Sequence, residues 1–122
     1  DLDPWPTNEF FEGSFHGHYL TRNRKRNWDL PSFTIVADGH HVPLHPSGKP
    51  MEYISKDKWR FGEGPNRRLS WRECLRIQGL PDIEDIDDTL LNKYKVIGNS
   101  VPPKLAEAVA RPVIEKLIEI IK

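Results

Sequence analysis

The chain has 122 residues, enough for one small domain or part of a larger protein, and its single cysteine excludes an internal disulfide framework. Charged residues make up 30% of the chain and balance to a net charge of zero, which argues against a uniformly basic nucleic-acid-binding domain. We find no signal-peptide pattern and no apolar run long enough to span a bilayer. We therefore expect a cytoplasmic protein with no membrane partner.

The first 18 residues combine aromatic residues with turn formers. Trp5 lies between two prolines, and Phe10, Phe11 and Phe15 follow it. We expect an irregular segment that buries these rings against the rest of the protein. The alternative is a linker that collapses onto the surface.

A basic run is the first candidate for a nucleic-acid contact. It consists of Arg22, Asn23, Arg24, Lys25 and Arg26. Arginine and asparagine can form two hydrogen bonds to one base edge, and arginine and lysine also hold phosphate. Because the acidic residues concentrate in residues 82–88, the segregated charges can still give one basic face. A solvated loop with no specific partner is the alternative.

The segment Phe33 to Ala37 is the best strand candidate in this region. It is rich in β-branched residues and is bounded by Pro31 and Gly39. Asp38 and Gly39 form a turn signal directly after it. The sequence therefore predicts a strand over 33–37 that ends in a tight turn.

Three nearby histidines, His40, His41 and His45, raise the question of a metal site. Zinc needs about four ligands in a defined geometry, and only Cys74, far away in the sequence, could add a sulfur ligand. We therefore expect no metal site. His40 and His41 are instead candidate contacts to base edges or phosphate, with plain turn structure as the alternative.

Residues 47–67 are rich in glycine and proline and predict loops around one short strand near Glu52 to Ser55. The element after them is better defined, because Ser70 and Glu73 form a Ser-x-x-Glu capping box. Gly79 suits the position just after a helix C-terminus. The sequence therefore predicts a helix over 71–78.

Three residues in or near this helix have chemistry to consider. Cys74 lies mid-helix with no adjacent base, which is typical of a small core residue. Arg68 and Arg72 are candidate contacts to phosphate.

The apolar residues Leu90, Leu91, Tyr94 and Ile97 share one face and predict a second short helix. We expect this helix to stop at Gly98 with a positive φ, and Asn99 and Ser100 to follow in a turn. Pro102 and Pro103 then suit the first turn of another helix. Such a turn would present Asn99, Ser100 and free backbone N–H groups to a polar or anionic ligand. The alternative is an ordinary corner between two helices.

The last predicted helix runs from about Pro103 to Ile121. Its apolar face is broad for a surface helix, and Pro112 is expected to kink it. A small, turn-rich domain is poorly placed to bury all of this face. We expect part of it to dock on another domain, with an internal core helix as the alternative.

Two of these stretches resemble conserved motifs of one enzyme family. Gly-Asn-Ser-Val-Pro-Pro, residues 98–103 after an aromatic residue, resembles the last conserved motif of the DNA (cytosine-5) methyltransferases. Residues 68–82 resemble the motif just before it, and the two occur in family order. In that family this motif supports the recognition region, which implies a mainly scaffolding role for Arg68 and Arg72. The variable target-recognition region precedes them in that family, and Thr34-Ile35-Val36-Ala37 resembles a pattern found there.

The resemblance implies an α+β architecture in two parts. Residues 1–67 would form a small, irregular, β-containing target-recognition region that binds double-stranded DNA. Residues 68–122 would hold the last two motifs, with short helices and a long helix over 103–121 that packs on a missing, Rossmann-like catalytic domain or subunit. The expected setting is a prokaryotic cytoplasm.

The resemblance also implies the chemistry of the site. Asn99, Ser100 and Val101 would line one side of the S-adenosylmethionine pocket. The family's nucleophile is a cysteine in a Pro-Cys loop, which this chain lacks, so we expect no catalytic residue here and no activity from the chain alone. It would be either a separately encoded subunit of a split enzyme or a domain of a longer one. The alternatives are a stand-alone DNA-binding module and a vestigial structural domain.

Overall fold

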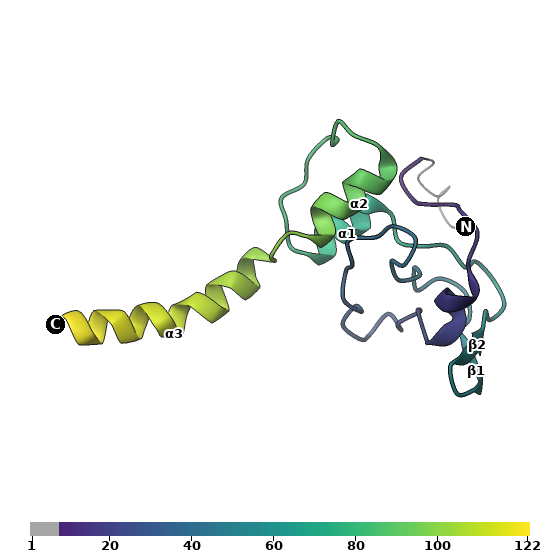
Figure 1. Cartoon of the computed structure of the whole chain (residues 1–122), viewed down its shortest axis with the longest axis horizontal. Helices are drawn as coiled ribbons and strands as arrows, with labels where there is room; N and C mark the ends of the chain where they lie inside the picture. Colours follow the sequence, from purple (N-terminus) through teal and green to yellow (C-terminus); the bar gives the residue numbers. More distant parts are fainter. Residues whose placement is uncertain (1–7) are drawn as a thin grey trace.

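The computed structural model describes residues 8–122, so Trp5 lies outside the described part. Short elements joined by long loops make up most of the structure, and one long helix extends from it (Figure 1). The elements are the 3-10 helix η1 (Gly17–Thr21), strands β1 (Glu52–Ser55) and β2 (Lys58–Arg60), and helices α1 (Trp71–Ile77), α2 (Leu90–Gly98) and α3 (Pro103–Ile121). The predicted α+β composition is confirmed.

The only sheet in residues 8–122 is a small antiparallel hairpin. In it Tyr53 pairs with Trp59, and the two rings lie 5.3 Å apart between centroids. Asp57, with φ of 58°, makes the reversal between the strands. The strand over 52–55 was predicted, whereas its partner β2 was not, because three residues carry too little pattern to predict a strand.

The predicted strand over 33–37 is wrong. The segment has no strand assignment, because no neighbouring backbone forms a ladder with it. It is held by its side chains instead, since Ile35 is buried in the main core. The predicted turn after it is confirmed by a hydrogen bond from His41 N–H to the Asp38 carbonyl, at 3.0 Å.

Helix α1 begins where the sequence predicts and ends one residue earlier, at Ile77. The Ser70 hydroxyl accepts a hydrogen bond from the Glu73 N–H, and the Glu73 carboxylate accepts one from the Ser70 N–H, so the capping box is complete. Gly79 has φ of 73°, and the Leu80 N–H donates to the Leu75 carbonyl at 3.2 Å. This is the C-terminal motif that glycine permits.

Helix α2 forms as predicted, but the role of Gly98 is different. Gly98 is the last helical residue, with no left-handed φ, and Thr89 caps the other end. A Cβ on Gly98 would lie 2.4 Å from the Val36 oxygen and 2.5 Å from the Ala37 backbone. Glycine is needed here for close approach of the 36–37 segment and not for backbone freedom.

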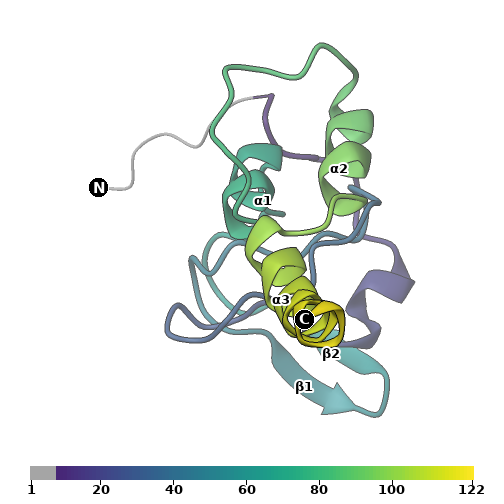
Figure 2. The ribbon, with the colours of Figure 1, turned by 90° about the vertical axis from the view of Figure 1, so that its left-hand side faces the viewer.

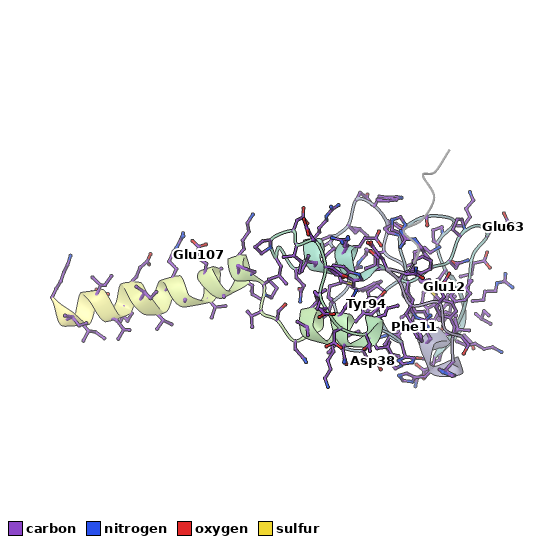
Figure 3. The ribbon with its side chains drawn as sticks, turned by 90° about the horizontal axis from the view of Figure 1, so that it is seen from above. Phe11, Glu12, Asp38, Glu63, Tyr94 and Glu107 are labelled. Atoms are coloured by element: carbon purple, nitrogen blue, oxygen red, sulfur yellow. The ribbon has the colours of Figure 1, made fainter. Side chains whose placement is uncertain are left out.

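The main core joins both predicted regions of the chain. Ile35 and Val42 from the first region pack with Trp71 and Tyr94 from the second. The Tyr94 hydroxyl donates to the Leu69 carbonyl at 2.6 Å and accepts from the N–H of Phe11 at 3.1 Å. Figure 3 shows the labelled Phe11 and Tyr94 within this packed body. The predicted packing of N-terminal rings is confirmed in part for the described residues: Phe10 is buried, and Phe11 and Phe15 are partly buried against the core clusters.

A second, smaller cluster lies around η1 and the hairpin. Tyr19, Leu44 and Met51 are buried in it, and Trp59 and Phe61 pack against them. In Figure 2 the hairpin lies at the opposite end of the molecule from α2, with α3 pointing toward the viewer.

Helix α3 leaves the packed body and buries none of its residues (Figure 1). Leu105, Val109, Val113 and Leu117 are all more than half exposed. The alternative of an internal core helix is therefore wrong. Pro112 was expected to kink this helix. The helix is not broken there, since α3 continues past Pro112 to Ile121 (Figure 1). No helix in residues 8–122 combines the length and the hydropathy needed to cross a membrane.

Candidate nucleic-acid interface

The basic run is held in place by two backbone segments. Lys25 forms a parallel bridge with Leu44, and Leu44 forms an antiparallel bridge with Arg68. The Leu44 N–H donates to the Arg24 carbonyl at 2.8 Å. The run is therefore part of a three-segment arrangement at the edge of the small cluster and is not a free loop.

A pocket of about 150 Å³ opens beside this run, and we call it the Arg22 pocket. Its lining consists of Arg22, Asn23, Arg24, Phe33, Thr34, Val36, His41 and Pro43. Side chains from three separate stretches converge there: the basic run, the 33–36 segment and the turn at His41. Five of the eight lining side chains carry hydrogen-bond donors, and the other three are apolar.

The five residues of the run do not all face solvent. Arg22 is exposed, and Asn23 and Arg26 are partly exposed. The Arg26 guanidinium lies over the Phe33 ring, 4.0 Å from its centroid. Arg24 and Lys25 are buried, at 4% and 3% exposure, and the Arg24 Nε donates to the Tyr19 carbonyl at 3.0 Å. The run thus divides into outward-facing and inward-facing side chains.

His40 and His41 share the carboxylate of Asp38. Their Nδ1 atoms lie 2.7 and 3.0 Å from its two oxygens. Burial by itself raises the pKa of Asp38, but the hydrogen bonds from the His40 backbone and from both rings outweigh it and lower the pKa to about 2. With Nδ1 engaged, each ring has its Nε2 left for a ligand. Only His41 lines the Arg22 pocket, whereas the His40 ring packs edge-on against Phe11.

Arg68 points into the protein, whereas Arg72 is partly exposed and bound to neighbouring segments. The Arg68 guanidinium donates to four backbone carbonyls, those of Phe11 (3.3 Å), Gly13 (2.7 Å), Ser14 (3.0 Å) and His40 (3.1 Å). Arg72 pairs with Glu9 at 2.8 Å and donates to the Ile83 carbonyl at 2.6 Å. Both side chains hold loops together, so neither is placed to hold phosphate in this structure.

The turn between α2 and α3 differs in part from the predicted one. The N–H groups of Asn99 and Ser100 donate to the carbonyls of Lys95 and Ile97, so they close α2 and are not free for a ligand. The Ser100 hydroxyl also donates to Ile97, at 2.6 Å. The side chains of Asn99 and Val101 are exposed and remain available as one wall of a pocket.

Cys74 is fully buried, and burial raises the pKa of its thiol to about 12. A thiol with this pKa stays protonated near neutral pH and is a poor nucleophile. In residues 8–122, no three His, Cys, Asp or Glu side chains gather in a way that could hold a metal ion.

Sequence reasoning missed four side chains that line the Arg22 pocket: Phe33, Thr34, Val36 and Pro43. Thr34 and Val36 had a signal, because they lie in the Thr-Ile-Val-Ala stretch, but the pattern could not show which side chains point toward the basic run. Phe33 and Pro43 gave no signal of their own.

Comparison with known proteins identifies relatives along nearly the whole chain. The family model of the C-5 cytosine-specific DNA methylases matches residues 3–115. The chain is 46% identical to type II methyltransferase M.BsuRI of Bacillus subtilis, over 91% of this chain and 28% of that relative. It is 42% identical to M.BspRI of Lysinibacillus sphaericus, over 99% and 31% of the two chains. It is 44% identical to M.MthTI of Methanothermobacter thermautotrophicus, over 88% of this chain and 34% of that relative. The chain therefore spans less than half the length of these curated relatives.

Proposed function

This chain belongs to the C-5 cytosine-specific DNA methylase family, and we propose that it is the DNA-recognition part of a methyltransferase acting on C5 of cytosine in a specific duplex sequence. The observation that carries the proposal is the Arg22 pocket, where the basic run, Thr34 and His41 meet on one surface. The donor side chains among its lining suit the acceptor groups of phosphates and base edges.

Within this proposal the basic run has two kinds of residue. Arg22, Asn23 and Arg26 contact DNA together with His41, because their side chains reach the surface. Arg24 forms part of the pocket wall from its buried position. The sequence placed Lys25, His40, Arg68 and Arg72 among the DNA contacts, and in our proposal they act as scaffold. The polar groups of Lys25, Arg68 and Arg72 already have protein partners, and the His40 ring packs against Phe11 outside the Arg22 pocket.

The family uses S-adenosylmethionine, which supplies the methyl group. We propose that the side chains of Asn99 and Val101, with Ser100 between them, form one wall of its pocket. A single exposed turn fits only one side of such a molecule, so the rest of the pocket comes from the catalytic domain or subunit. That part also supplies the nucleophile, since the buried thiol of Cys74 does not suit the role.

The exposed apolar face of α3 is the surface on which we propose that the catalytic domain or subunit docks. Leaving this face in water is unfavourable, because burying apolar surface lowers the free energy by about 25 cal/mol per Å². In Figure 3 the labelled Glu107 on α3 lies well outside the packed body, so the helix is accessible to a partner. The partner is either a second chain or another domain of a longer one.

The test of the proposal is a methyl-transfer assay with labelled S-adenosylmethionine and duplex DNA. We expect no transfer by this chain alone and transfer once a catalytic chain of the family is added. In the same assay Leu117→Glu, on the exposed apolar face, should prevent reconstitution, whereas Lys116→Glu, its neighbour on α3, should not. Transfer by the purified chain alone would refute the proposed division of labour, and DNA binding without any reconstitution would favour a stand-alone binding module.

The cofactor wall gives a second prediction for the reconstituted enzyme. Asn99→Ala removes one exposed amide and should weaken cofactor binding by about 1–3 kcal/mol, the range for losing a hydrogen bond and stranding its partner. Binding of duplex DNA should change much less. Isothermal titration with the cofactor and with DNA measures both, and a DNA affinity that falls while cofactor affinity holds would reverse the assignment.

The outward-facing residues of the run give a third prediction. Arg22→Ala and Arg26→Ala should each weaken DNA binding in the assembled enzyme, in one of two distinguishable ways. Loss of a phosphate contact lowers the salt slope, the steepness with which the logarithm of the binding constant falls with the logarithm of the salt concentration, by about 0.9. Loss of a base contact costs about 1–3 kcal/mol on the cognate site and relaxes discrimination at one base pair.

Binding to cognate and single-mismatch duplexes across salt concentrations separates these two outcomes. Arg76→Ala is the matched control, because Arg76 is exposed on α1 and belongs neither to the basic run nor to the lining of the Arg22 pocket. If both changes in the run behaved like Arg76→Ala, the run would be a solvated loop without a DNA contact.

A further inference from the structure

The ammonium of Lys25 is enclosed by four oxygens of the protein. Its Nζ lies 2.8 Å from the Ser47 carbonyl, 3.0 Å from that of Lys49 and 3.1 Å from that of Pro65, and 2.8 Å from Oδ1 of Asn66. An ammonium has only three N–H donors, so the four acceptors use all of them. With the side chain 3% exposed, no donor is left to point at a phosphate.

These oxygens come from two loops that are far apart in the sequence. Ser47 and Lys49 lie in one loop, and Pro65 and Asn66 lie in the other. The Lys49 N–H donates to the Glu63 carbonyl at 2.7 Å. The amide of Asn66 also donates to carbonyls of its own loop at 3.0 Å. The ammonium therefore fastens the basic run to both loops at once.

The same residue is connected to the Arg22 pocket through its backbone. The Lys25 N–H donates to Oδ1 of Asn23 at 3.1 Å. This bond holds the Asn23 side chain and leaves its NH₂ group as the part that can face a ligand. On the other side the Arg24 carbonyl accepts from the Leu44 N–H. A shift of Lys25 would therefore be passed directly to Asn23, which lines the pocket.

We propose that Lys25 is a positioning residue for DNA recognition: its buried ammonium fixes the backbone of the basic run so that Asn23 presents its amide donors in the Arg22 pocket. This inference rests on the proposed function and reverses the sequence-based expectation that Lys25 touches DNA. It follows that removing Lys25 affects discrimination between sequences, which a lost phosphate contact would not do.

The first experiment measures binding of the assembled enzyme to cognate and mismatched duplexes across salt. For Lys25→Met we expect an unchanged salt slope and discrimination that falls about tenfold, equivalent to roughly 1.4 kcal/mol. A slope lower by about 0.9 would overturn the proposal, since it would identify a phosphate contact. Equal weakening on both duplexes would also overturn it, since that is the result of a general loss of folded protein.

A double-mutant cycle tests the route through Asn23. If Lys25 acts through Asn23, then Lys25→Met should change discrimination little in a protein that already carries Asn23→Ala. Additive effects of the two changes would overturn this step. Lys58→Met on β2 is the matched control, because it removes the same charge from an exposed position.

Amide hydrogen exchange gives a readout that needs no DNA. In the full chain, Lys25→Met should speed exchange in residues 22–26, 47–49 and 62–66, and Lys58→Met should leave those residues unchanged. Unchanged exchange in Lys25→Met overturns the positioning role, whereas a wild-type enzyme that binds no duplex DNA refutes the proposed function instead. If Lys25→Met does not fold, Asn66→Ala removes one of the four acceptors and should move discrimination and exchange in the same directions by smaller amounts. No movement with Asn66→Ala would likewise overturn the proposal.

Discussion

Replacing Arg68 by methionine is expected to lower the free energy of unfolding by about 3–5 kcal/mol, measured by urea denaturation. The side chain is 1% exposed, and its guanidinium donates to four backbone carbonyls. It also lies 4.0 Å from the centroid of the Phe15 ring. Methionine occupies a similar volume but has no donor, so four partly buried carbonyls lose their partner.

The control for this change is Arg76→Met. Arg76 makes an exposed ion pair with Asp82, a type of interaction that contributes little to stability. The effect of losing Arg68 should be concentrated in residues 11–14 and at His40, next to the Arg22 pocket, and hydrogen exchange can locate it. If the two variants unfolded at the same urea concentration, the carbonyl contacts of Arg68 would have no stabilising role.

Gly98→Ala is expected to destabilise the protein by about 1–3 kcal/mol, the usual range for overpacking a core. The added methyl group would lie within 2.5 Å of backbone atoms of Val36 and Ala37, and backbone cannot turn aside as a flexible side chain can. Alanine favours a helix over glycine by up to about 1 kcal/mol, which offsets only part of this cost. Val36 lines the Arg22 pocket, so DNA binding should weaken as well.

Gly17→Ala is the matched control, since no atom lies within 4 Å of a Cβ built there and its φ is not left-handed. Thermal unfolding and DNA affinity of both variants, the latter in the assembled enzyme, provide the comparison. A Gly98→Ala protein as stable as the wild type would mean that the 36–37 segment moves aside at little cost. If the protein were destabilised but its DNA affinity unchanged, the contact of Gly98 with the 36–37 segment would have no role in DNA recognition.

Local signals in the sequence determined the helices and the family. Three of these signals are the capping box at Ser70, the glycine at position 79 and the prolines at the start of α3. Each acts within a few residues of the chain, so its effect does not depend on the rest of the fold. The broad apolar face of α3 was equally visible, because helical periodicity alone places those side chains on one side. The two motifs at 68–82 and 98–103 indicated the family in the same way, as unbroken stretches.

The tertiary structure decided which residues of the candidate site face outward. Arg22 and Lys25 are three positions apart in one basic run, yet Arg22 is exposed and Lys25 is enclosed by oxygens from residues 47–66. Gly98 likewise serves a backbone segment some sixty residues earlier in the chain. Such contacts depend on which loops meet in space, and no pattern within the run encodes that. Charge and propensity are properties of a residue, whereas burial and partners are properties of the whole fold.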